Sequence, residues 1–239
     1  MTERGRHDLH ATATTLAIGP SALHWDGTSL AIELDERTAP LPSRLRGTVR
    51  VTPQALLDRS RALDHDGAHR WQVLAPHARI DVALDRPGVH WSGTAYVDTN
   101  RGTAPLEQAF SGWHWSRARV GDGTAIFYDV AARDGRHRCL ALHCADDGRV
   151  SDFEPPPVVA LPRSGWGIAR ATRARPGDAR LVRTLVDTPF YARSLVASCT
   201  LRERVTAVHE SLSLDRFNAR WVRALLPFRM PRHALHHHG

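Results

Sequence analysis

The sequence predicts an all-β protein made of short antiparallel strands. The dipeptide Asp-Gly, which favours tight hairpin turns, occurs five times in the 239 residues. Each occurrence separates short runs in which apolar residues alternate with polar ones, or in which β-branched and aromatic residues are enriched. Many short strands joined by regular turns are typical of a sandwich or a barrel.

The hairpins are expected in order along the chain. Ser21–Leu34 is the first, with Asp26-Gly27 at its turn. The remaining turns are predicted at Asp66-Gly67, Asp122-Gly123, Asp134-Gly135 and Asp147-Gly148. The flanking strands are predicted at Gly47–Pro53, Arg70–Leu74, Ala78–Leu84, Thr124–Val130 and Arg138–Cys144.

Helix signals are weak and limited to two segments. Gln54–Leu63 is compatible with a short helix, as is Leu214–Leu226, where Asp215 is a candidate cap and Pro227 bounds the end. Apolar residues recur at helical spacing in the second segment, and we interpret this stripe as core packing. The stripe consists of Phe217, Trp221 and Leu225.

The chain is basic, with a formal charge of +7 and a pI near 10.5. Such a charge suits nucleic acid or an anionic membrane surface. There is no lysine, and the arginines are scattered, with no nucleic-acid-binding motif beside them. We therefore expect no nucleic-acid partner, whereas peripheral contact with a membrane becomes attractive if the ligand is lipid-soluble.

Sequence features also bear on location. No apolar run approaches the roughly 20 residues that span a bilayer. Met1–His10 is polar, and no apolar signal-peptide segment follows it. The cysteines lack Cys-x-x-Cys spacing and are expected to be reduced thiols. These features predict a cytoplasmic protein with at most peripheral membrane contact.

Two pairs of side chains stand out as a candidate site. In the strand-like alternation after Trp91, Tyr96 and Asp98 are two residues apart and share a face. His69 and Trp71 share a face in the same way, just after the Asp66-Gly67 turn. From the residues alone, Asp98 could instead bond backbone groups of the following turn, Tyr96 could pack in the core, and His69 could be structural.

The stretch that contains Asp98 also carries a specific motif. It reads Gly-x-x-Tyr-x-Asp-x-Asn-x-Gly-x-x-Pro-Leu-Glu and then, after a short spacer, Phe-x-x-Trp-x-Trp-Ser-Arg-Ala. This combination resembles the signature of the carotenoid 1,2-hydratase (hydroxyneurosporene synthase) family. Its residues are Gly93, Tyr96, Asp98, Asn100, Gly102, Pro105, Leu106, Glu107, Phe110, Trp113, Trp115, Ser116 and Arg117.

Further blocks extend the resemblance over essentially the whole chain. They are MTERGR at Met1–Arg6, LAIGPSALHWDG at Leu16–Gly27, DTPFYARS at Asp187–Ser194, HESLSLDRF at His209–Phe217 and LLPFRMPR at Leu225–Arg232. The resemblance implies two consecutive lipocalin-like antiparallel barrels with a short C-terminal helix. We place the division near Pro105, which gives domains at residues 1–105 and 106–239. Members of the family usually carry β-structure upstream of the block that here begins at Met1, so the first barrel is expected to be incomplete.

The resemblance implies that water is added to the terminal 1,2 double bond of an acyclic carotenoid such as neurosporene or lycopene. His69, Trp71, Tyr96 and Asp98 match the catalytic positions of the family. An isolated alkene is a poor base, so its hydration requires a protonated carboxylic acid, aromatic faces for the carbocation and a polar group for the water. We assign these roles to Asp98, to Trp71 with Tyr96, and to His69, which would orient or deprotonate the water.

Three other side chains are candidates for substrate binding. Trp113 and Trp115 are predicted to form a pocket wall or to pack in the barrel floor. Glu107 is a second carboxylate, with a helix-start or salt-bridging role as its alternative. No zinc-binding spacing, phosphate-binding loop or dinucleotide fingerprint is present. Hydration is redox-neutral, so we expect neither a metal nor a cofactor.

Two other functions remain open at this stage. A lipocalin-like protein could bind or carry a polyene without converting it. A related fold could instead guide the cyclisation of a polyene, although the paired site residues favour hydration.

Overall fold

The computed structural model describes residues 4–38 and 42–226. Within them the chain is an antiparallel all-β protein with few, short helices, which confirms the predicted class. The strands are β1 Leu9–Ala11, β2 Thr15–Ile18, β3 Ser21–Trp25, β4 Leu30–Arg37, β5 Arg44–Pro53, β6 Ser60–Ala62, β7 His69–Arg86, β8 Val89–Gly102, β9 Phe110–Val120, β10 Gly123–Ala132, β11 His137–Ala145, β12 Val150–Asp152, β13 Val158–Leu161, β14 Arg170–Arg173, β15 Arg180–Asp187, β16 Tyr191–Thr200 and β17 Glu203–Ser213. The helices are η1 Arg6–Asp8, α1 Leu106–Ala109, α2 Leu214–Phe217 and α3 Arg220–Leu225.

The chain divides into two compact units, each assembled from separate stretches of sequence. Of the described residues, the first contains 4–38, 42–54, 78–96 and 223–226, and the second contains 55–77 and 97–222. The long strands β7 and β8 each contribute to both units. The division into domains at residue 105 stays a prediction.

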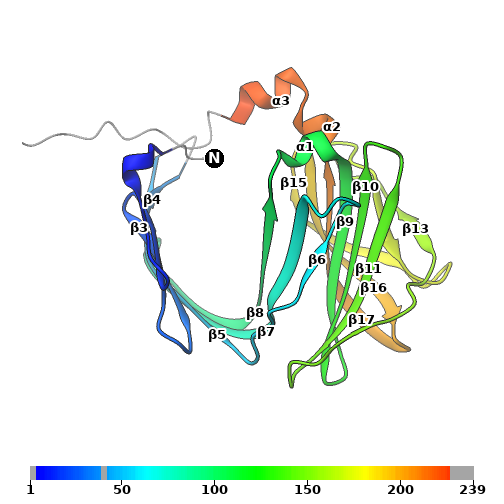
Figure 1. Ribbon diagram of the computed structural model, residues 1–239, viewed down its shortest axis with the longest axis horizontal. Coiled ribbons are helices and arrows are strands. Elements are labelled where there is room, and N and C mark those ends of the chain that lie inside the picture. The colour runs from blue at the N-terminus through cyan, green and yellow to red at the C-terminus, as the bar shows by residue number, and fades with distance from the viewer. Residues whose placement is uncertain (1–3, 39–41, 227–239) are drawn as a thin grey trace, which may run out of the picture. The chain divides into compact units, whose positions relative to one another are not determined.

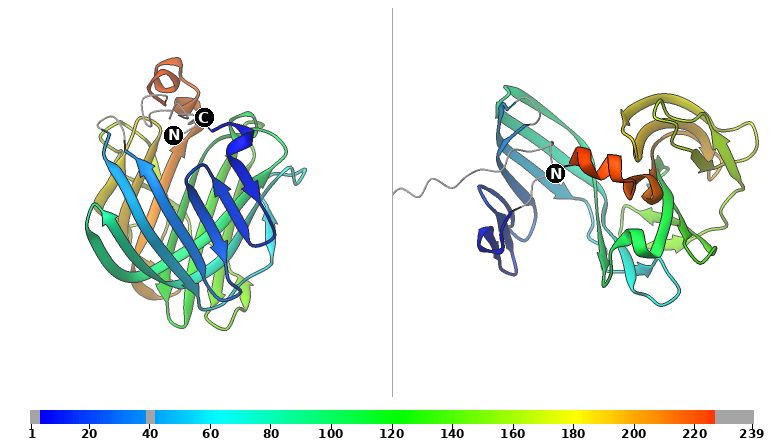
Figure 2. Two further views of the ribbon diagram at one scale, coloured as in Figure 1. Left: turned by 90° about the vertical axis from the view of Figure 1, so that its left-hand side faces the viewer. Right: turned by 90° about the horizontal axis from the view of Figure 1, so that it is seen from above.

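In the first unit, β1 to β5 form a meander in which each strand pairs with the next. The second half of β7 continues this sheet by pairing with β5. Figure 2 shows β3, β4 and β5 side by side in shades of blue.

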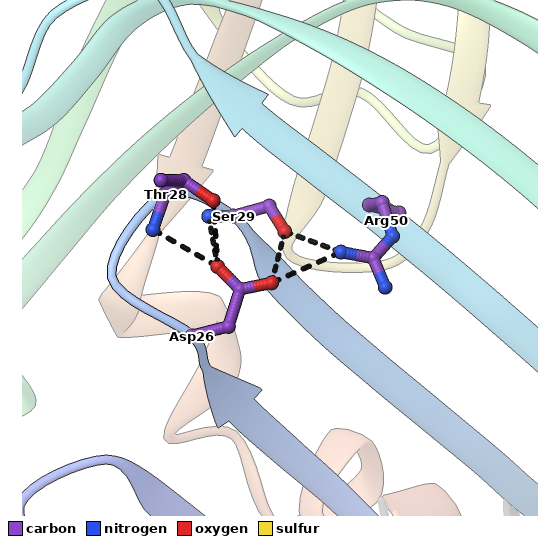
Figure 3. A network of polar contacts seen from close by, with 4 residues as sticks. All are labelled: Asp26, Thr28, Ser29 and Arg50. Carbon is purple, nitrogen blue, oxygen red and sulfur yellow. Dashed lines mark hydrogen bonds and ion pairs between the residues drawn. The ribbon is translucent and has the colours of Figure 1, made fainter.

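The predicted Asp26-Gly27 turn joins β3 to β4 and is held by the Asp26 carboxylate (Figure 3). Its oxygens accept hydrogen bonds of 2.7–3.1 Å from the backbone and side chains of Thr28 and Ser29 and from the Arg50 guanidinium. The bonds from the backbone N–H groups, that of Ser29 foremost, hold the pKa of Asp26 well below its usual range. Gly27 has a φ of +96°, which residues with a side chain rarely adopt. In this turn Asp26 therefore supplies the hydrogen-bond acceptor and Gly27 supplies the backbone conformation.

The second unit is built on a seven-stranded antiparallel sheet in the order β12-β11-β10-β9-β17-β16-β15 (Figure 1). β13 and β14 pair to form a separate two-stranded sheet. The hydrogen-bonded order has β12 at one edge and β15 at the other, and no ladder in the described part of the chain joins them. The barrels expected from the sequence are therefore open sheets in residues 4–38 and 42–226.

The register of the central strands gives the seven-stranded sheet two different faces. Trp115 of β9 lies opposite Tyr128 of β10, while its neighbour His114 lies opposite Asp129. Because successive side chains of a strand point to opposite faces, aromatic groups gather on one side and polar groups on the other. The aromatic face carries Trp113, Trp115 and Tyr128, and the polar face carries His114, Asp129, His209 and Ser211.

The local turn predictions are confirmed. Each of the five Asp-Gly dipeptides lies at a connection between two paired antiparallel strands. The predicted strands Arg70–Leu74 and Ala78–Leu84, however, are parts of the single strand β7. Pro76, which has no N–H to donate, lies between the ladder with β6, which ends at Gln72, and the ladder with β5, which begins at Ala78.

Both helix predictions need correction. Gln54–Leu63 is not helical: it is an extended connection followed by β6. Its backbone bonds to β7 rather than to itself, since the Leu57 N–H donates to the Leu74 carbonyl and the Gln72 side chain donates to the Leu57 carbonyl. Tertiary pairing thus outweighs the weak local helix preference.

The C-terminal helical segment is broken into α2 and α3. The N-cap of α2 is Ser213, whose hydroxyl accepts the Arg216 N–H, and not Asp215. The interpretation of Trp221 and Leu225 as core residues is also wrong, because both are 47% exposed. Pro227 lies outside the described residues. None of the helices in residues 4–38 and 42–226 has the length and apolar character needed to cross a membrane.

Candidate functional site

The second unit brings together three of the four predicted catalytic side chains. Trp71 of β7 donates its indole N–H to the Asp98 carboxylate of β8, with 2.8 Å between Nε1 and Oδ2. Trp71 is only 1% exposed, and Asp98 is half-buried. The link joins the two pairs that the alternation pattern had indicated separately.

His69, two residues before Trp71, is anchored at both ring nitrogens. Nδ1 lies 2.6 Å from Oδ2 of Asp64, and Nε2 lies 2.9 Å from the Ala104 carbonyl oxygen. Both partners offer an acceptor oxygen, so neither ring nitrogen presents a free lone pair to the site. The ring is 2% exposed and makes an edge contact with Phe110.

Asp64 is a member of this cluster that the sequence analysis missed. Burial acts to raise its pKa, but the hydrogen bonds and charge of His69 outweigh burial and the pKa lies below its usual value. Its second oxygen accepts the backbone N–H of His69 at 3.1 Å. The available signal was that Asp64 and His69 lie on either side of the same hairpin turn. Such a turn brings the residues before and after it close together.

A second missed residue is Tyr128, on the aromatic face of the seven-stranded sheet. Its ring contacts the edge of Trp71, with centroids 5.2 Å apart at 83°, and also approaches Trp113 at 6.2 Å. Burial and then the nearby charge of Asp98 raise the pKa of Tyr128 well above its usual range, so the phenol stays protonated. No local pattern could have indicated it, because its link to Trp71 joins strands far apart in sequence.

The other predicted site residues are distributed differently. Tyr96 is half-buried on β8 and is the last residue of that stretch assigned to the first unit, whereas Asp98 belongs to the second. Glu107 lies in the first turn of α1 and is half-buried. Trp115 is buried at 7% exposure, while Trp113 is half-buried.

Trp113 lines a cavity of about 560 Å³ in the second unit. Apolar side chains form part of its wall, and the ion pair between Arg173 and Asp129 lies among the polar lining groups. His114 also lines it, and burial lowers the pKa of this imidazole. The apolar lining residues include Trp113, Val130, Val158, Ile168 and Leu212.

Among residues 4–38 and 42–226, no group of three or more His, Cys, Asp or Glu side chains could hold a metal ion. The three cysteines are free thiols. Burial, the largest cause, raises the pKa of Cys139 to about 12 and that of Cys144 to about 11. These two thiols are therefore protonated and poorly nucleophilic at neutral pH.

Comparison with known proteins gives a consistent result. The family model described as carotenoid hydratase CrtC matches residues 1–238. The acyclic carotenoid 1,2-hydratase of Thiocapsa roseopersicina is 52% identical over 234 residues, which cover 97% of this chain and 58% of the relative. The protein of the same name from Rubrivivax gelatinosus is 48% identical and is also covered over 58% of its length. The chain thus spans less than two thirds of these two relatives.

A third acyclic carotenoid 1,2-hydratase, from Cereibacter sphaeroides, is 42% identical over 97% of this chain and 84% of the relative. Among solved structures, the crystal structure of CghA with Sch210972 matches with a TM-score of 0.51 and 12% identity, over 86% of this chain and 70% of that one. At this identity the likeness concerns the fold alone, which is lipocalin-like. From the match over residues 1–238 and these identities, the chain belongs to the carotenoid hydratase family.

Proposed function

We propose that the protein is a cofactor-independent hydratase. It adds water to the terminal 1,2 double bond of an acyclic carotenoid, such as neurosporene or lycopene, and gives a 1-hydroxy carotenoid. The names of the relatives support this substrate class. The observation that carries the chemistry is the hydrogen bond from Trp71 to Asp98, because it joins a buried aromatic ring to a half-buried candidate acid.

Asp98 is the proposed proton donor. The Trp71 N–H donates to Oδ2, so this oxygen acts as the acceptor and the acidic proton belongs on the other oxygen, Oδ1. That proton passes to the less substituted carbon of the double bond, and a tertiary carbocation forms at the neighbouring carbon. The water oxygen then bonds to the carbocation, and the Asp98 carboxylate recovers the proton that the water loses.

Aromatic side chains stabilise the cation in this mechanism. The proposal assigns this role to the Trp71 indole, whose N–H bonds the proposed acid. A cation over a desolvated aromatic face gains about 2 kcal/mol. Tyr128 supports the Trp71 ring from the edge, and Tyr96, two residues from Asp98 on the same strand, is the proposed second ring.

His69 orients the water in this proposal. Both of its ring nitrogens face acceptor oxygens, so neither presents a free lone pair that could take a proton from the water. The hydrogen bond from His69 instead holds the Ala104 carbonyl in position. The carbonyl oxygen has a second lone pair that can accept a hydrogen bond from a water molecule.

Substrate binding involves the remaining candidates. Trp113 supplies the wall of the apolar part of the cavity, where hydrocarbon can be held. Trp115 supports that wall through its place on the same face of β9, and Glu107 is the proposed polar contact.

The test is product analysis with neurosporene and lycopene in detergent, with ¹⁸O-labelled water. Asp98→Asn keeps the shape and an acceptor for Trp71 but removes the acid, so hydration should fall by at least about 10²-fold. Asp66→Asn makes the same change at an exposed turn carboxyl and should leave the rate unchanged. Full activity in Asp98→Asn, with label in the product, would remove Asp98 as the acid.

The second candidate is a polyene-binding protein without catalysis. It is favoured by the fully occupied ring nitrogens of His69 and by the cavity lined by Trp113. Binding alone would shift the absorption bands of lycopene and yield no hydroxylated product. A Trp113→Ala variant should then lose the shift.

A further inference from the structure

Two tryptophans of the second unit form an exposed stacked pair. Trp166, in the loop between β13 and β14, and Trp221 of α3 have ring centroids 6.2 Å apart at 26°. They are 49% and 47% exposed. Figure 1 shows α2 and α3 in orange after β17. Large apolar rings left exposed as a pair are unusual on a protein surface and indicate an interaction site.

The loop that presents Trp166 is firmly held. The Asp187 carboxylate, at the end of β15, accepts the backbone N–H groups of Gly165 and Trp166. From the other side, the Arg216 guanidinium donates to the Trp166 carbonyl. The exposure of the ring is therefore a property of an anchored loop.

Positive charge lies beside the pair. Arg216 donates to the carbonyl of Trp166, and Arg163 donates to the carbonyl of Gly167 in the same loop. A backbone carbonyl satisfies a guanidinium donor without neutralising its charge. Asp187 places one negative charge at the loop, against the two guanidinium groups, and the charge of Asp215 is paired with Arg133. We call this surface the Trp166 rim, and it consists of Trp166, Trp221, Arg163 and Arg216.

The Trp166 rim borders the cavity described above. Arg163, Gly167 and Arg216 are among the residues that line it, together with Trp113. One edge of the second unit therefore combines exposed indoles, guanidinium groups and access to apolar space.

We propose that the Trp166 rim docks on an anionic bilayer surface. Tryptophan prefers the headgroup level of a bilayer, where its ring is in an apolar region and its N–H remains hydrated. Arginine binds phosphate through its planar fork of donors and is attracted by the negative potential of anionic lipids. The +7 formal charge of the chain acts in the same direction. This docking rests on the proposed function, because a carotenoid substrate is dissolved in the bilayer. Binding to the bilayer can still be measured without any conversion of substrate.

Co-sedimentation with unilamellar vesicles, without carotenoid, tests the proposal. The full chain should bind vesicles of phosphatidylglycerol mixed with phosphatidylcholine, release them as salt is raised, and bind pure phosphatidylcholine weakly. The double variant Trp166→Ala/Trp221→Ala should bind at least about tenfold more weakly. Trp91→Ala, at a tryptophan 50% exposed on β8, is the matched control and should bind normally.

Charge variants separate the two contributions. Arg163→Gln with Arg216→Lys removes one charge and keeps the other at the loop, and it should weaken binding to anionic vesicles only. Arg149→Gln removes one exposed charge at the β11–β12 turn and should have no effect. Equal binding of both vesicle types, or unchanged binding by the double tryptophan variant, would overturn the proposal.

A protein partner would give a different result. If the chain forms a dimer in solution that only the double tryptophan variant dissociates, a second copy covers the rim and the membrane proposal is overturned. Hydration of detergent-dissolved lycopene is assayed in parallel. The tryptophan variant should lose vesicle binding and keep hydration. Asp98→Asn should lose hydration and keep vesicle binding. The two assays therefore distinguish failure of docking from failure of the proposed function.

Discussion

His69 and His209 are almost equally buried, at 2% and 1% exposure, but their hydrogen-bond partners differ. His69 has the Asp64 carboxylate at one nitrogen and a carbonyl at the other. His209 donates Nε2–H to the Ala171 carbonyl at 2.8 Å, and its Nδ1 has no hydrogen-bond partner within the described part of the chain.

The difference shows that equal burial can leave two imidazoles with very different polar partners. Desolvation disfavours the charged ring in both places. A carboxylate at 2.6 Å opposes that penalty for His69. For His209 burial prevails and lowers the pKa to about 4. His69 lies beside the proposed catalytic pair, and His209 lies on the polar face of the sheet.

The largest effect is expected for Asp64→Asn. It leaves His69 without its anionic partner, and breaking a buried ion pair in this way costs about 3–5 kcal/mol of unfolding free energy. Urea unfolding at neutral pH measures the loss. A loss no larger than that of Asp66→Asn, a change at an exposed turn carboxyl, would contradict the comparison.

A smaller effect is expected from acid acting on His209. The folded protein keeps this ring neutral down to about pH 4, whereas in the unfolded chain the imidazole has its ordinary pKa of 6.5. The unfolded state therefore binds more protons in this window, and stability falls as the pH is lowered from 6.5 to 4, by about 3 kcal/mol from this group. The ring is buried beside His114 and Arg170, which lower the pKa further, while Asp129 raises it.

His209→Gln measures this contribution, because glutamine keeps a donor for the Ala171 carbonyl but does not titrate. Unfolding free energies at pH 7 and pH 4.5 should differ less in the variant than in the wild type. An unchanged difference would mean that His209 titrates normally in the folded protein.

The smallest effect is expected for Ser211→Ala. The Ser211 hydroxyl lies 2.9 Å from Nδ1 of His114, whose ring stacks on that of His209. Loss of one neutral hydrogen bond should cost about 1 kcal/mol. A cost as large as that of Asp64→Asn would show that the polar face also depends on charge and would remove the distinction between the two histidines.

Much of the local structure could be predicted from the residues. The Asp-Gly turns and the face-sharing pairs His69 with Trp71 and Tyr96 with Asp98 depend on contacts within a few residues. Helices were predicted poorly, because a segment such as Gln54–Leu63 shows a weak local preference that pairing with β7 outweighs. The roles of the site residues, the cytoplasmic location and the absence of a nucleic-acid partner stay predictions.

Turn chemistry and the two-residue period of a strand depend on neighbouring residues. The strands, the hairpins and the family motif could therefore be predicted from the sequence alone. Which side chains meet across the sheet was not, because register and pairing act over long separations. The bond from Trp71 to Asp98, the edge contact of Tyr128 and the exposure of Trp221 arise in this way. The sequence pattern of an apolar stripe does not show whether the stripe packs against a sheet or remains exposed to water.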